Sequence, residues 1–184
     1  MPLLENDRSR LGNPNPKATL ARKPASLGLL HAAKSLDLGL QVLEVRRRED
    51  VLGSFRAARD GHADAINVFS SPFLASLFRE IIVSSAEYRL PAIYQWSEHV
   101  EAGGLVSFGP GLAAMFWQAA TIVVQILKGA KPTDLPVEQP IKFELAVNAR
   151  TAQALGLGIP PSVLVRADAV IEWSRAPASG VKRT

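Results

Sequence analysis

"ADAINVFSSPFLASLFREIIVSSAEYRLPAIY", residues 63–94, is the stretch that decides the fold. It places one short apolar run, residues 63–69, before a helical segment and a second run, residues 90–94, after it. Ser71 followed by Pro72 is typical of a helix start, because the serine side chain accepts from free amides and proline fits the first helical position. Two short apolar strands joined by one helix predict a parallel β-α-β unit.

The chain before this unit continues the same rhythm. Residues 26–36 predict a helix, within a broader helical pattern over residues 18–38 that Pro24 interrupts. Residues 40–45 alternate as a strand does, and residues 49–60 carry apolar residues on one helical face. We therefore predict an α/β fold with a parallel sheet between two layers of helices, a fold in which ligands bind at the carboxyl ends of the strands.

The rhythm changes in the second half of the chain. Residues 105–109 predict a strand, and residues 111–128 predict a helix with apolar residues on nearly every side. Such a helix needs cover from its own fold or from a partner. The chain is then expected to run extended through Pro132, Pro136 and Pro140. It continues with a strand at residues 141–148, a short helix, the proline turn "IPPS" and a final segment.

The longest apolar window, residues 103–127, does not predict a membrane span. A span needs about 20 predominantly apolar residues. The window reaches that length only by including a glycine-rich start and Pro110, and Gln118 and Gln125 interrupt it.

Composition excludes several classes of function. The 184 residues are 47% hydrophobic and 21% charged, which is typical of a globular protein, and no cysteine is present for disulfides, thiolate metal sites or a thiol nucleophile. The net charge of +4 permits an anionic partner without requiring one. The basic run Arg46, Arg47 and Arg48 precedes Glu49 and Asp50, which favours a solvated strand-to-helix loop over a nucleic-acid patch.

No catalytic constellation emerges from the sequence. His31, His62 and His99 are far apart and lack partners at metal-ligand spacing, and no phosphate-binding or nucleophile motif is present. We expect neither a metal nor a cofactor. Glu98 and Glu101 lie one helical turn apart, so a small α/β enzyme remains the third-ranked hypothesis behind two solvated glutamates. The predicted sheet edge instead offers small polar side chains beside aromatic ones, which suits binding of a small ligand.

Two segments carry a resemblance to a known family. "RLPAIYQWSEHVEAGGLVSFGP", residues 89–110, and "ILKGAKPTDLPVEQPIKFELAVNARTAQALGLGIPPSVLVRADAVIE", residues 126–172, resemble the tryptophan/tyrosine-type substrate-binding proteins of ABC transporters. These proteins are relatives of the periplasmic binding proteins of type I fold. The resemblance extends more weakly back to "GNPNP", residues 12–16, which is similar to the loop after the first strand of the family's second lobe.

The resemblance implies two α/β lobes joined by crossing strands, with the solute in the cleft between them. The first lobe would be largely missing from this chain, and the proline-rich connection would be a stiff crossover. The implied divisions are an irregular segment 1–11, a second-lobe domain 12–104, a crossover strand and helix 105–131 belonging to the first lobe, a return crossover completing the second lobe at 132–172, and a flexible tail 173–184.

The resemblance also implies a function and a set of contacts. The chain would be the substrate-binding component of an ABC importer, would not be an enzyme, and would bind an amino-acid-like solute and the membrane permease subunits, with no nucleic acid. Phe108 stands where the family has tyrosine. The expected ligand-binding residues are Asn15, Ser70, Ser71, Tyr94, Ser107, Phe108 and Gly109.

Two expectations follow from what the resemblance does not cover. Family members are exported to the periplasm, but the first residues show no signal-peptide pattern, so the chain as written would be cytoplasmic. We therefore hypothesise a truncated gene product. The alternative is an isolated lobe that acts as an interaction module and dimerises through the apolar helix 111–128.

Overall fold

The described strands form one seven-stranded sheet in the order β2-β1-β3-β4-β5-β6-β7. This computed structural model describes residues 19–21, 27–136 and 142–172. All neighbouring strands are parallel except β5 and β6, which are antiparallel. The strands are β1 Thr19–Ala21, β2 Val42–Glu44, β3 Ile66–Val68, β4 Ala92–Tyr94, β5 Val106–Pro110, β6 Phe143–Asn148 and β7 Ala169–Ile171. The mixed α/β class predicted from the sequence is confirmed.

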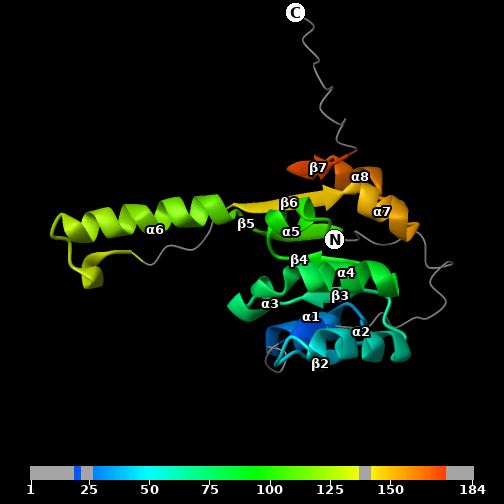
Figure 1. Cartoon of the computed structure of the whole chain (residues 1–184). Coiled ribbons are helices and arrows are strands. Elements are labelled where there is room, and N and C mark those ends of the chain that lie inside the picture. The colour runs from blue at the N-terminus through cyan, green and yellow to red at the C-terminus, as the bar shows by residue number, and fades with distance from the viewer. Residues whose placement is uncertain (1–18, 22–26, 137–141, 173–184) are drawn as a thin grey trace, which may run out of the picture.

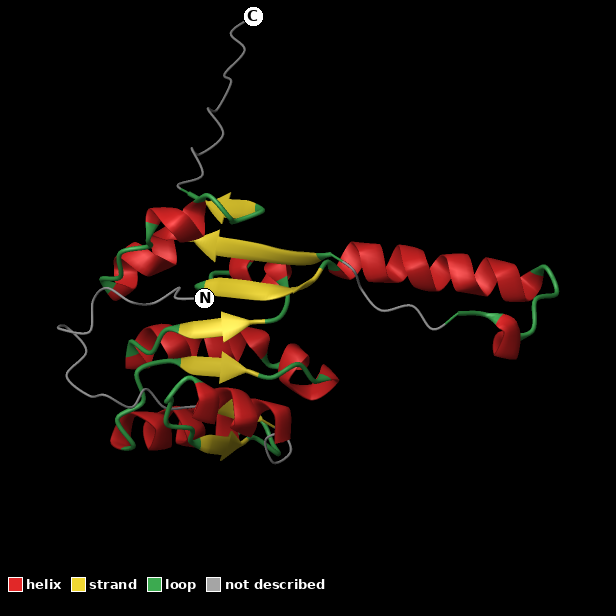
Figure 2. Ribbon diagram, turned by 180° about the vertical axis from the view of Figure 1, so that it is seen from behind, coloured by secondary structure: helices red, strands yellow, loops and turns green. Residues whose placement is uncertain are grey.

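Helices alternate with these strands along the chain (Figure 1). Helices α4 and α5 lie on one face of the sheet, in front of it in Figure 1 and behind it in Figure 2. Helix α1 connects β1 to β2, which is the one described β-α-β connection that moves towards the β2 end of the sheet. Because such connections are right-handed, α1 lies on the face opposite to α4 and α5. The helices are α1 Leu27–Ser35, α2 Asp50–Asp60, α3 Pro72–Ser76, α4 Phe78–Tyr88, α5 Ser97–Glu101, α6 Leu112–Leu127, α7 Ala149–Leu155 and α8 Pro161–Leu164, with a 3₁₀ turn η1 at Pro132–Asp134.

Local signals fix where the helices begin and end. The Ser71 side chain accepts a hydrogen bond from the Leu74 amide at 3.1 Å, and Pro72 occupies the first turn of α3, as the sequence predicted. Asn148 caps α7 in the same way through the Thr151 amide. Gly156 ends α7 at φ 75°, a conformation that glycine adopts without steric cost.

The main core lies under α2 and α4. Its side chains come from the covered face of the sheet and from the inner faces of these two helices. This burial is the main force that holds the parallel strands together, because apolar surface removed from water contributes about 25 cal/mol per Å². The largest fully buried side chains include Val45, Phe55, Ile66, Leu74 and Ile81.

The basic run after β2 is neutralised locally. Arg46 pairs with Glu44, Arg47 with Asp50, and Arg48 with Glu80 at 2.8 Å. The backbone amides of Arg47 and Arg46 both donate to the Asp50 carboxylate, and these bonds hold the pKa of Asp50 below its usual range. The loop interpretation is therefore confirmed for this run.

The structure corrects three local predictions. Residues 19–21, assigned to a helical pattern, form β1, because an extended segment there fills the sheet between β2 and β3. The single helix expected after Ser71 is broken at Leu77, whose buried side chain packs into the core at φ −106° and ψ 11°. Pro132 begins a 3₁₀ turn instead of an extended run, and Pro140 lies outside the described residues.

Helix α6 projects from the sheet instead of packing on it (Figures 1 and 2). It leaves at the edge towards which β3 and β4 point, directly after β5. None of its residues is buried, and Trp117 is 77% exposed. Within the described residues, no helix has both the length and the apolar character needed to cross a bilayer.

We predict that Phe55→Ala lowers the free energy of unfolding by about 3–5 kcal/mol, because the ring is fully buried between α2 and its neighbours. The measurement is urea denaturation followed by circular dichroism. Leu52→Ala on the same helix is the control, since Leu52 is exposed and its loss should cost well under half as much. Equal losses for the two variants would contradict the assigned core.

Candidate functional site

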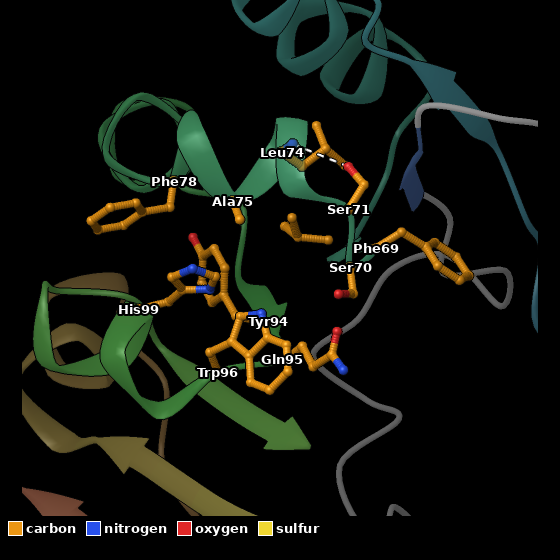
Figure 3. A pocket seen from close by; sticks show the side chains of 11 residues that line it. Phe69, Ser70, Ser71, Leu74, Ala75, Phe78, Tyr94, Gln95, Trp96 and His99 are labelled. Carbon is orange, nitrogen blue, oxygen red and sulfur yellow. Dashed lines mark hydrogen bonds between the residues drawn. The ribbon is translucent and has the colours of Figure 1, made fainter. Parts of the chain in front are cut away.

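A shallow pocket lies at the carboxyl ends of β3 and β4. Its floor comes from the strand ends, and its walls come from α3, the start of α4, and α5 (Figure 3). The free volume is about 10 Å³, room for about one water molecule. The lining residues are Val68, Phe69, Ser70, Ser71, Leu74, Ala75, Phe78, Tyr94, Gln95, Trp96 and His99.

The loop after β3 supplies two serines with different tasks. Ser71 is committed to the start of α3, because its side chain accepts from the Leu74 amide. Ser70 precedes the helix and is exposed at the mouth of the pocket. In Figure 3 the side chain of Ser70 extends towards that of Gln95, which follows β4. Ser70 is therefore the serine best placed to contact a bound molecule.

Gln95 and Trp96 form the second wall of the mouth. The Gln95 Oε1 atom is buried and has no hydrogen-bond partner within the described structure. The Gln95 backbone oxygen lies so close to Gly109 that a side chain on Gly109 would collide with it. This close approach of the chain explains why glycine occupies position 109 of β5.

A cluster of rings closes the inner end of the pocket. His99 stacks on Phe78 with centroids 5.1 Å apart and meets Tyr94 edge-on at 5.5 Å. Burial raises the pKa of Tyr94 and lowers the pKa of His99, with the Glu98 carboxylate partly opposing the shift of His99. His99 Nδ1 is buried without a hydrogen-bond partner among the described residues, whereas the Ser85 side chain interacts with the Tyr94 hydroxyl and partly opposes the rise of its pKa.

The seven predicted ligand-binding residues do not all gather at this pocket. Ser70, Ser71 and Tyr94 line it. Ser107 is the register partner of Tyr94 and is fully buried beside it, with its hydroxyl unpartnered in the described structure. Their roles in binding stay predictions.

Two further predicted residues, Phe108 and Gly109, lie outside the described lining of the pocket. Phe108 is on the opposite face of β5, 55% exposed, and stacks on Phe143 with centroids 5.5 Å apart. Gly109 packs against Gln95, and Asn15 lies outside the described residues. These positions too remain predictions as ligand contacts.

Sequence reasoning did not predict the aromatic lining residues Phe78 and His99. Gln95 and Trp96 follow β4 directly, so their position after a predicted strand is a signal that could have found them. His99 is half-buried, and α5 turns its ring against Phe78 and Tyr94. No spacing in the sequence signals this contact, because the three rings come from different elements.

The described part of the site is uncharged. No Asp, Glu, Lys or Arg is among the described lining residues. Glu98 and Glu101 are exposed on α5 and outside the lining set, so the arrangement gives no support to an acid-base pair. Among the described residues no group of three His, Cys, Asp or Glu side chains could hold a metal ion.

Comparison with known proteins identifies the family. The family of ABC transporter substrate binding proteins matches residues 15–171, so the chain belongs to this family. A search of curated protein sequences found no significant match.

Three solved structures share the fold. One, a conserved domain protein from Vibrio cholerae, is 24% identical with a TM-score of 0.74 over 84% of this chain and 54% of that one. A domain from Streptococcus pneumonia in complex with L-Trp is 26% identical with a TM-score of 0.74 over 85% and 56%. A ligand-free, open substrate binding protein with adhesive properties from Clostridium difficile is 19% identical with a TM-score of 0.59 over 86% and 55%.

The three solved structures are longer than this chain. The chain spans about half the length of the solved structures it matches. The family is one of substrate binding proteins, and the Clostridium difficile structure is also described as a substrate binding protein. The predicted family and fold class are confirmed.

We predict that the chain loses stability as the pH falls from about 6.5, the pKa of an unperturbed histidine, because the lowered pKa of His99 leaves the unfolded chain binding the proton first. His99→Gln should reduce the loss of unfolding free energy between pH 7.5 and pH 5. The measurement is urea denaturation at the two pH values. His31→Gln, at an exposed position of α1, is the control and should retain the wild-type loss; an identical loss in the His99 variant would refute the assignment.

Proposed function

We propose that this chain carries the second lobe of a substrate-binding component of an ABC importer and presents half of a solute cleft. The solute is small and amino-acid-like, and the protein acts outside the cytoplasmic membrane beside its permease subunits. Family membership supports the class, and the relative that holds L-Trp supports the kind of solute. The single observation that carries the proposal is the pocket at the carboxyl edge of the parallel strands.

The position of α6 supports the two-lobe arrangement. Helix α6 leaves the sheet directly after β5, and β6 and β7 complete the sheet next to β5. A first lobe seated on α6 would cover its exposed apolar side chains and face the pocket at the same time. The domain division 12–104, 105–131 and 132–172 stays a prediction.

The size of the pocket also supports a shared site. Room for one water molecule is far below the volume of about 300–1,000 Å³ that usually encloses a small-molecule ligand. The lobe therefore contacts one side of the solute, and closure of the other lobe supplies the remaining contacts.

We predict that amino acids bind the isolated chain weakly, in the millimolar range, and shift the amide resonances of Ser70, Gln95 and Trp96 in a ¹⁵N NMR titration. Ser70→Lys should abolish these shifts because the longer side chain fills the mouth of the pocket. Ser76→Lys, at an exposed position of α3 outside the lining set, should leave them unchanged. Shifts confined to other parts of the chain would refute the placement of the cleft.

The exposed surface of α6 favours a second candidate, an isolated lobe that dimerises through this helix. Phe116, Trp117 and Leu127 are 67%, 77% and 81% exposed. We predict that light scattering detects self-association of the purified chain and that Trp117→Glu reduces it at least tenfold, because a buried carboxylate lacks a partner. Val83→Glu, at a 63% exposed apolar position on α4, is the control. A monomer at all concentrations would exclude this candidate.

A further inference from the structure

The helix that forms one wall of the pocket is short. Helix α5 spans only Ser97–Glu101, and its N-cap residue Trp96 makes no side-chain capping hydrogen bond in the described structure. Trp96 and His99 line the pocket from this segment (Figure 3). A helix this short is unstable by itself in water, because few hydrogen bonds offset the cost of ordering the backbone. The position of this wall therefore depends on contacts with the rest of the fold.

The last turn of α5 is held by Asn148, the final residue of β6, which is only 5% exposed. The Asn148 Nδ2 atom donates to the Val100 carbonyl oxygen at 3.1 Å. The Oδ1 atom of the same side chain accepts from the Thr151 amide at 3.0 Å, and the Asn148 backbone amide donates to the Leu105 carbonyl oxygen at 2.8 Å. One buried residue thus joins the end of α5 to the start of α7.

Thr151 makes a second bond to the same end of α5. Its hydroxyl donates to the Gly103 carbonyl oxygen at 2.9 Å, just after the helix ends. The last carbonyl groups of a helix have no partner within the helix, so donors from elsewhere in the fold fix where the helix ends. Each of these two bonds joins residues 48 positions apart, and they tie α5 to the end of β6 and the first turn of α7.

These two residues act on the pocket only through α5, because neither Asn148 nor Thr151 is among its described lining residues. We propose that Asn148 and Thr151 are positioning residues for the solute cleft, whose side-chain hydrogen bonds to α5 set where Trp96 and His99 stand at the pocket. The inference rests on the proposed function of this edge and adds the residues that shape it from outside. The pocket wall is thereby tied to the strand that pairs with β5.

Variants of Thr151 test the positioning role in NMR spectra of the full chain. Thr151→Val removes the hydroxyl but keeps the shape and the amide that Asn148 caps, whereas Thr151→Ser keeps the hydroxyl. Burial holds the pKa of His99 below its usual range, so this ring reports how closely α5 packs. We expect His99 to titrate closer to its ordinary value in Thr151→Val and as in the unaltered chain in Thr151→Ser. The Trp96 resonances should shift only in Thr151→Val.

Solute affinity gives the second measurement. L-Trp, which one solved relative holds, is the probe in ¹⁵N NMR titrations. Thr151→Val should weaken its binding about threefold to tenfold, an effect of the size of one net hydrogen bond. Asn148→Ser should do the same, because serine is a good N-cap residue for α7 but has no amide to donate to Val100. Thr151→Ser should bind L-Trp within about twofold of the unaltered chain, since its hydroxyl still makes the bond.

Ala154→Gly separates positioning from general stability. Ala154 is exposed on α7, and glycine there weakens the helix without removing either bond to α5. We expect this variant to lower the urea midpoint while leaving the His99 titration, the Trp96 resonances and the L-Trp affinity unchanged.

The outcomes distinguish this inference from the proposed function. A Thr151→Val chain that is less stable but keeps the His99 titration and the Trp96 resonances of the unaltered chain would overturn the positioning role alone. The same holds if Ala154→Gly changes these signals as much as Thr151→Val does. Absence of any shift at this edge when L-Trp is added to the unaltered chain would instead overturn the proposed function, and with it the role of the two residues in solute binding.

Discussion

The antiparallel ladder between β5 and β6 is the constraint on which the rest of the structure depends. Five register pairs, from Val106–Val147 to Pro110–Phe143, join the five strands of the first half to β6 and β7. The segment between these two strands can only leave and return at one edge of the sheet. That edge also carries the carboxyl ends of β3 and β4, so α6 begins at the same edge of the sheet as the pocket. The pairing of β5 with β6 therefore sets both the order of the last strands and the edge of the sheet at which α6 leaves.

Buried polar groups without partners are concentrated around the strand ends. Gln95, His99 and Ser107 lie on the loop after β4, on α5 and on β5, and each has an unpartnered buried atom within the described structure. Such atoms cost free energy that a fully apolar core would avoid. Gln95 and His99 also line the pocket, so part of this cost falls at the candidate site.

Several features could be predicted from the sequence because they depend on local chemistry. Ser71 and Pro72 mark a helix start wherever they occur before an apolar helix, and Asp50 closes the loop after the arginine run through neighbouring amides. The β-α rhythm needs only strand and helix periods, so the parallel sheet followed from it. Failures occurred where packing overrides local preference, at β1 and at the break beside Leu77.

The candidate site likewise has a part that local sequence predicts and a part that depends on tertiary packing. The sequence by itself determined the family, the α/β order and the loops that reach the carboxyl edge, because these follow from motifs and periodicity. Only the tertiary structure decided that Ser107 and Phe108 face opposite sides of one strand in surroundings of different polarity, and that His99 turns inwards onto Phe78 and Tyr94. The physical reason is that a side chain's neighbours come from distant elements, and those contacts exist only after the sheet has formed and its helices have packed.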